Sequence, residues 1–61
     1  MRKLTYEEEG NLIELVGAFA EDHAQFIQKF ASDPKSVNLM HELLTAEKLG
    51  KAIATYVESL L

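Results

Sequence analysis

Apolar residues in the first half of the chain recur at helical spacing. From Leu12 onwards they lie alternately four and three residues apart, and a histidine occupies one of the positions. The positions are Leu12, Val16, Phe19, His23, Phe26 and Phe30. An alternation of this kind is typical of a helix with one apolar stripe. It predicts a helix over about residues 5–32, in which Ile13, Ala20 and Ile27 widen the stripe.

Both ends of this helix carry sequence signals. Thr5 is followed three residues later by Glu8, which has the form of a capping box, where each side chain binds a free backbone N–H at the helix start. At the other end a Ser-Asp-Pro sequence interrupts the pattern. Asp33 can cap a following helix, and Pro34 fits its first turn because no N–H partner is needed there. A turn is therefore expected at about residues 32–35.

The second half of the chain repeats the same spacing. Its positions are Leu39, Leu43, Ala46, Gly50, Ile53, Val57 and Leu60, and the flanking residues that broaden the stripe are Met40, Leu44, Leu49, Tyr56 and Leu61. This pattern predicts a second helix over about residues 34–60. Antiparallel pairing of the two helices sets Phe19 near Ala46 and Gly50, a match of a large side chain with small ones.

A division into three helices is the alternative. The segment from Leu44 to Leu49 resembles a helix start and would split the second half into a helix-turn-helix unit. A DNA-reading unit of that kind needs a glycine-containing turn and a basic recognition helix. Residues 46–61 instead hold two lysines and two glutamates, and the apolar spacing continues through Thr45. We therefore expect the second helix to be uninterrupted.

The apolar stripes are too wide for a hairpin that stays alone. At about 100° per residue the first stripe spans about 200° and the second more, whereas one core-facing side needs about 100°. The chain has 61 residues and no cysteine, so oligomerisation is the natural way to reinforce its small core. We predict an all-α fold, in which residues 1–61 form one antiparallel two-helix hairpin that dimerises into a four-helix bundle.

A stripe of small residues adds a second predicted helix contact. Gly10, Gly17, Ala24 and Ala31 recur every seven residues along one flank of the first helix, where another backbone could approach closely. The alternative is that the glycines contact nothing and cost the helix about 1 kcal/mol each. The resulting interface candidates are Leu12, Val16, Gly17, Phe19, His23, Ala24, Phe26, Phe30, Leu43, Gly50, Ile53 and Val57.

The net charge of −4 comes entirely from the first half of the chain. Residues 1–33 hold seven acidic and three basic residues, whereas residues 34–61 hold three of each. Glu7, Glu14 and Glu21 repeat every seven residues and form an acidic ridge on the outer face of the first helix. The ridge could engage another protein with a basic surface, or it could be an ordinary solvated face. Direct binding to nucleic acid is not expected, because the charge has the wrong sign.

Association with a membrane is not expected either. No stretch approaches the ~18 consecutive apolar residues that span a bilayer. The polar face of the second helix has too few basic residues for a surface-bound helix, and the first residues lack the apolar core of a signal peptide. We therefore expect a cytoplasmic protein.

Residues that could carry chemistry are few. His23 lies within the apolar stripe. Its imidazole could act as a pH switch or as a ligand. The alternative is that His23 is a core side chain that forms a hydrogen bond with Glu42 on the second helix. His41 and Glu42 begin the zinc-protease pattern His-Glu-x-x-His, but Thr45 replaces the second histidine. A catalytic zinc site needs three protein ligands and a structural one four. We therefore expect no metal, no cofactor and no catalytic residue.

The sequence favours a small non-enzymatic protein-interaction module. It would be a regulator or inhibitor that acts as a homodimer and presents an acidic outer face to another protein. Two alternatives stay open: a small subunit of a hetero-complex that buries its apolar stripes against a different protein, and a ligand or metal site centred on His23.

Overall fold

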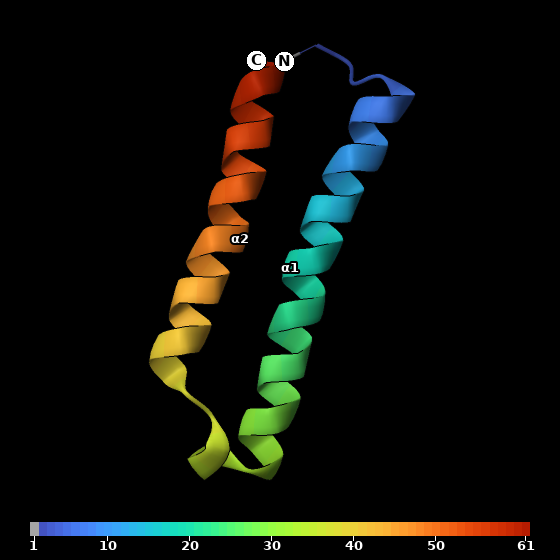
Figure 1. The fold of residues 1–61 in the computed structure, drawn as a ribbon. Coiled ribbons are helices and arrows are strands. Elements are labelled where there is room, and N and C mark those ends of the chain that lie inside the picture. Colours follow the sequence, from blue (N-terminus) through green and yellow to red (C-terminus); the bar gives the residue numbers. More distant parts are fainter. Residues whose placement is uncertain (1) are drawn as a thin grey trace.

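The computed structural model describes residues 2–61, which form two helices and a short turn. Helix α1 covers Tyr6–Ser32, the 3₁₀ turn η1 covers Pro34–Ser36, and helix α2 covers Leu39–Leu60. The helices run antiparallel, side by side, in a molecule that measures 45 × 17 × 14 Å (Figure 1). No strand occurs within residues 2–61. The predicted all-α hairpin is therefore confirmed.

Helix α1 begins at the predicted capping box. The backbone N–H of Glu8 donates to Thr5 Oγ1 at 3.1 Å, and the backbone N–H of Thr5 donates to Glu8 Oε1 at 2.9 Å. Three glutamates occupy the first turn, where negative charge interacts favourably with the helix dipole. The local sequence thus determines where α1 starts.

Helix α2 begins later than predicted. Pro34 starts only the short turn η1, and Asp33 makes no side-chain capping bond within the described residues. The cap is instead Asn38, whose Oδ1 accepts a hydrogen bond from the backbone N–H of His41 at 3.0 Å. Asn38 stands directly before the apolar run, so an amide cap at this position starts the helix at Leu39.

The three-helix alternative is contradicted. Helix α2 continues without a break from Leu39 to Leu60, and the Thr45 hydroxyl donates to the carbonyl oxygen of His41 one turn earlier, at 3.0 Å. This bond is the usual way in which a helix accommodates threonine in its interior. Neither helix within residues 2–61 combines the length and the apolarity needed to cross a membrane.

The two helices meet along a narrow row of half-buried side chains, which we call the hairpin seam. On α1 it consists of Leu12, Leu15, Phe19, Asp22 and Phe26, and on α2 of Glu42, Ala46, Leu49, Ile53, Tyr56 and Leu60. Only Leu60 is buried among residues 2–61, with 7% of its surface exposed. The hairpin therefore encloses almost no core of its own.

Candidate interaction surface

The apolar stripe predicted for α1 does not point directly at α2. Leu15 and Asp22 are half-buried in the hairpin seam, whereas their neighbours Val16 and His23, which belong to the predicted stripe, are exposed. At about 100° per residue the predicted stripe is rotated from the hairpin seam by about 40° on α1 and by about 50° on α2. Glu42 consequently faces Asp22, and its predicted pairing with His23 is corrected.

A second apolar row lies beside the hairpin seam on α1. Its members are again three and four residues apart, and they are Ile13, Val16, Ala20, His23, Ile27 and Phe30. All of them are exposed, and Ile13 has 64% of its surface open to solvent. The spacing places this row about 90° around α1 from the hairpin seam.

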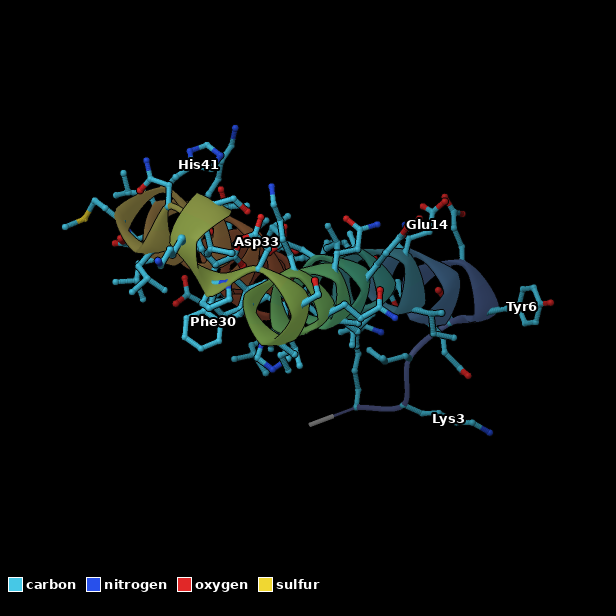
Figure 2. All side chains as sticks on the ribbon, turned by 90° about the horizontal axis from the view of Figure 1, so that it is seen from below. Lys3, Tyr6, Glu14, Phe30, Asp33 and His41 are labelled. Carbon is cyan, nitrogen blue, oxygen red and sulfur yellow. The ribbon has the colours of Figure 1, made fainter. Side chains whose placement is uncertain are left out.

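Helix α2 has a matching row about 80° from its own side of the hairpin seam. The row consists of Leu39, Leu43, Gly50, Val57 and Leu61. The rotation from the seam to the row has the same sense on both helices and nearly the same size. Because the helices run antiparallel, these rotations place both rows on the same side of the hairpin. The two rows together form one surface, which we call the apolar face. Figure 2 shows Phe30 projecting on the side opposite to Glu14 and His41.

The interface candidates from the sequence fall into four groups. Those in the hairpin seam are Leu12, Phe19, Phe26 and Ile53; those exposed on the apolar face are Val16, His23, Phe30 and Leu43; those half-buried at its inner edge are Gly50 and Val57. Gly17 and Ala24 are also exposed, on the flank of α1 that faces away from α2. No heavy atom lies within 4 Å of a Cβ built on Gly10 or Gly17, apart from the local helix backbone. The small-residue stripe thus makes no contact within the hairpin.

The acidic ridge lies on the other side of the molecule. Glu7, Glu14 and Glu21 are all exposed, and their spacing places them about 120° from the hairpin seam, in the direction opposite to the apolar face. None of the three forms an ion pair within residues 2–61, and Glu21 only accepts a long hydrogen bond of 3.5 Å from Gln25 Nε2. The molecule therefore has one apolar side and one acidic side.

Hydrogen bonds join the helices at the end where α1 starts and α2 finishes, which we call the open end. The Tyr56 hydroxyl donates to the carbonyl oxygen of Glu8 at 3.4 Å and accepts from Asn11 Nδ2 at 3.3 Å. The two terminal nitrogens of the Arg2 guanidinium donate to the Glu8 carboxylate, Nη2 to Oε2 at 2.6 Å and Nη1 to Oε1 at 2.8 Å. Hydrogen bonding to Arg2, with a further contribution from Thr5, lowers the pKa of Glu8 to about 2.

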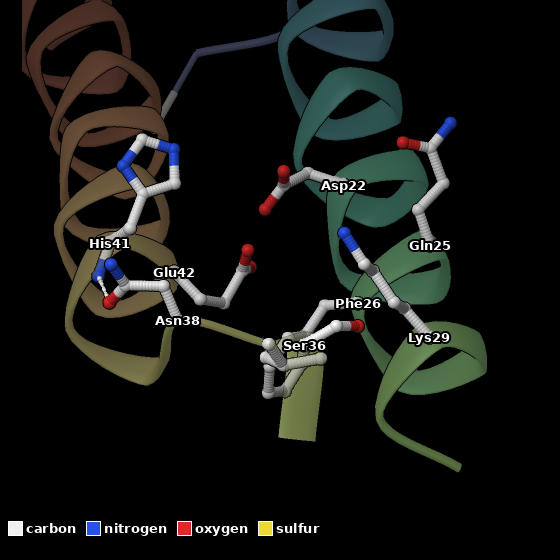
Figure 3. A pocket seen from close by; sticks show the side chains of 9 residues that line it. Asp22, Gln25, Phe26, Lys29, Ser36, Asn38, His41 and Glu42 are labelled. Carbon is white, nitrogen blue, oxygen red and sulfur yellow. Dashed lines mark hydrogen bonds between the residues drawn. The ribbon is translucent and has the colours of Figure 1, made fainter. Parts of the chain in front are cut away.

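The opposite end of the hairpin, next to η1, is the loop end, and it contains a pair of acids. Asp22 on α1 and Glu42 on α2 point toward one another across the seam (Figure 3). They line an open pocket of about 330 Å³ together with Lys29, Asn38, His41 and four further residues. Hydrogen bonding to Asp22, partial burial and the charge of Asp22 raise the pKa of Glu42, and the charges of the histidines act against that rise.

The sequence pattern did not reveal Asp22 as a contact residue. The hairpin seam follows a regular 4-3 alternation from Leu12 to Phe26, but an acid occupies one of its positions. A search for apolar periodicity passes over that position and selects the neighbouring stripe, in which His23 stands among apolar residues. The alternating spacing of three and four residues would have indicated Asp22 as a contact residue if polar positions had been counted together with apolar ones.

Known proteins give no further guide to the function. A scan against protein-family models and searches of curated proteins and of solved structures found no match to the chain. Within residues 2–61 no three His, Asp or Glu side chains come together in a way that could hold a metal ion.

Proposed function

We propose that this chain is a small non-enzymatic protein-interaction module, a regulator or inhibitor, that acts as a homodimeric four-helix bundle. The observation that carries the proposal is the apolar face, which combines a row of exposed side chains on α1 with the exposed Leu39, Leu43 and Leu61 and the half-buried Val57 on α2. In the dimer, the apolar faces of two copies pack against one another. The acidic ridge of each copy stays on the outside.

The surface area of the hairpin supports a second copy as the occupant of this face. The chain exposes 5029 Å². Its mass is 6.9 kDa, and a compact folded monomer of that mass exposes about 4,000 Å². The difference of about 1,000 Å² is close to the ~800 Å² that each partner buries in a standard protein interface. A dimer would thus bring the exposed area of each chain to the value expected for a folded protein.

The direction of the predicted stripes also supports a bundle. In a four-helix bundle of square cross-section each helix has two neighbours at right angles, so its core-facing direction lies about 45° from either one. The stripes of α1 and α2 are rotated from the hairpin seam by about 40° and 50°. Both rotations are toward the apolar face. The most apolar line of each helix therefore points where the centre of such a bundle would lie.

The homodimer is tested by the solution mass of the purified chain over a wide range of concentrations. We expect a mass of two chains from sedimentation equilibrium or light scattering. Leu43→Asp places a charge on the apolar face and should give monomers. Leu44→Asp is the matched control, because Leu44 is exposed to a similar extent, 58% against 65%, but points away from both α1 and the apolar face.

Two results would contradict the homodimer. One is a well-folded monomer at every concentration, and the other is an equal effect of the two aspartate variants. A chain that folds only after another protein is added would identify the apolar face as the contact surface of a hetero-complex subunit.

The partner is proposed to be another protein with a basic surface, since the acidic ridge carries three exposed carboxylates that form no ion pair within residues 2–61. Replacing Glu7, Glu14 and Glu21 together by lysine should abolish the capture of that protein in cross-linking experiments with cell extract. Helix content by circular dichroism and the mass of the dimer should not change. Lysine at Glu47 and Glu58 on α2 is the control for a general change of charge. Binding that survives the triple change would rule out the ridge as the contact surface.

A further inference from the structure

The two acids at the loop end occupy positions that otherwise hold the contacts between the helices. Asp22 and Glu42 are both half-buried in the hairpin seam, and their carboxyl groups point toward one another from separate helices (Figure 3). Neither carboxyl group forms an ion pair within the described residues. Two like charges at such a contact oppose the approach of the helices that carry them.

A single proton changes the sign of this interaction. When one of the two groups is protonated, it can donate a hydrogen bond to the other, and the repulsion between charges disappears. Two carboxyl groups that interact in this way titrate as a pair, and the first deprotonation is easier than the second. Whether the two carboxyl groups attract or repel one another thus depends on pH.

The other charged groups around the pair do not remove this dependence. Lys29 on α1 and His41 on α2 line the same pocket, and η1 contributes the uncharged side chain of Ser36. His23 lies near enough for its charge to act on Glu42. The ammonium group of Lys29 attracts both carboxylates, so it weakens their mutual repulsion and acts on the two groups in the same direction.

We propose that Asp22 and Glu42 form a proton-dependent contact that closes the loop end of the hairpin when the pair shares one proton and weakens it when both groups are ionised. The contact is a property of the hairpin itself and does not require the dimer. It gives the loop end a response to pH within the range where the second proton of the pair is lost.

The direction of the response follows from the like charges of the two carboxyl groups. The raised pKa of Glu42 means that the folded chain holds this proton more tightly than the unfolded chain does. The contribution to stability is therefore complete below the ordinary pKa of glutamate and is lost as the pH rises through the higher value of the folded chain. The hairpin should gain stability when a neutral solution is made mildly acidic.

The first experiment is a titration of the side-chain carboxyl carbons by NMR. In the natural chain we expect Glu42 to titrate above an ordinary glutamate. In Asp22→Asn the Glu42 titration should return toward the ordinary value, because its charged partner is gone. Glu14→Gln, which removes an exposed acid far from the pair, should leave the Glu42 titration unchanged. An ordinary Glu42 pKa in the natural chain, or no response to Asp22→Asn, would overturn the proposal.

The second experiment measures the consequence for stability. The urea midpoint of the natural chain should rise between about pH 7.5 and about pH 5, and in Glu42→Gln it should be higher than natural at about pH 7.5 and change less with pH. All chains are compared at one concentration, with their masses checked by light scattering. A lower midpoint for Glu42→Gln at about pH 7.5 would contradict repulsion between the ionised groups. The carboxyl titration is read for each residue separately, so a failure of the dimer and a failure of this contact give different results.

Discussion

The two ends of the hairpin are held in different ways. At the open end Tyr56 hydrogen-bonds across the seam to Glu8 and Asn11, and Leu60 is the one buried residue among residues 2–61. At the loop end the corresponding contact is the carboxyl pair Asp22 and Glu42. The same antiparallel geometry therefore gives one end that attracts at any ordinary pH and one end whose contact depends on a shared proton.

The exposed apolar surface is distributed in the same uneven way. Among residues 2–61 the apolar face has four large exposed side chains near the loop end, Ile27, Phe30, Leu39 and Leu43, and three nearer the open end, Ile13, Val16 and Leu61. Apolar side chains contribute to stability only when they are removed from water. The loop end thus has the weaker contact inside the hairpin and the larger apolar area available to another chain. We infer that the open end depends mainly on the hairpin and the loop end mainly on the dimer.

The largest expected effect comes from truncating one leucine at each end. Leu60→Ala removes the buried side chain of the open end and should lower the free energy of unfolding by about 2 kcal/mol, the small end of the usual range for buried leucine because the core is thin. Leu43→Ala makes the same change on the apolar face at the loop end. Its cost should be small in dilute solution and should grow with protein concentration, since Leu43 is buried only in the dimer.

Urea denaturation followed by circular dichroism at several protein concentrations measures both effects. The Leu60→Ala loss should be present at every concentration. If Leu60→Ala and Leu43→Ala showed the same dependence on concentration, the inferred difference between the two ends would be wrong.

A smaller effect is expected from the hydrogen bonds of the open end. Tyr56→Phe keeps the ring in the seam and removes the hydroxyl that bonds to Glu8 and Asn11. The bonds measure 3.3 and 3.4 Å, so we expect a loss of about 0.5–1 kcal/mol. Tyr6→Phe is the matched control, because Tyr6 is 95% exposed and its hydroxyl forms no hydrogen bond within residues 2–61. Equal urea midpoints for the two variants would show that the Tyr56 bonds do not hold the helices together.

The sequence was sufficient to predict the features that depend on local interactions. The capping box of Thr5 and Glu8 lies at the start of α1, because its hydrogen bonds join residues only three apart. The start of α2 was less predictable, since Asp33 and Asn38 are both suitable caps and Pro34 made the first one attractive. The choice between them depends on how the chain turns, which a local pattern does not encode.

The sequence could not predict how each helix is rotated about its own axis, and the reason is a different one. An apolar arc of about 200° on α1 contains more than one 4-3 row, and periodicity alone does not say which row faces the other helix. The hairpin uses the row through Leu15 and Asp22 and leaves the row through Val16 and His23 exposed. The partner of Glu42 is therefore Asp22, a contact between like charges that a search for complementary pairs does not select.

The smallest expected effect concerns Glu8 in acid, and it separates the two ends by the sign of their response. Hydrogen bonding to Arg2 lowers the pKa of Glu8 from 4.5 to about 2, so its contribution to stability is present above pH 4.5 and is lost as the pH falls toward about 2. Over that range the raised pKa of Glu42 keeps the loop-end pair from becoming fully ionised, so the repulsion between its charges does not return. Acid should therefore loosen the open end first. Glu8 is at the surface, and the change in the urea midpoint should be modest because solvent screens the ion pair.

Glu8→Gln tests this response, because it removes the charge and leaves a side chain that can still accept a bond from the Thr5 N–H. The variant should lose the fall in urea midpoint between about pH 4.5 and pH 2, and the amide resonance of Thr5 should no longer shift over that range. Glu7→Gln, also in the first turn but without the Arg2 contact, should keep both. If Glu8→Gln and Glu7→Gln behaved alike, the acid response would come from the helix dipole acting on the whole first turn, and the Arg2 contact would contribute little at the open end.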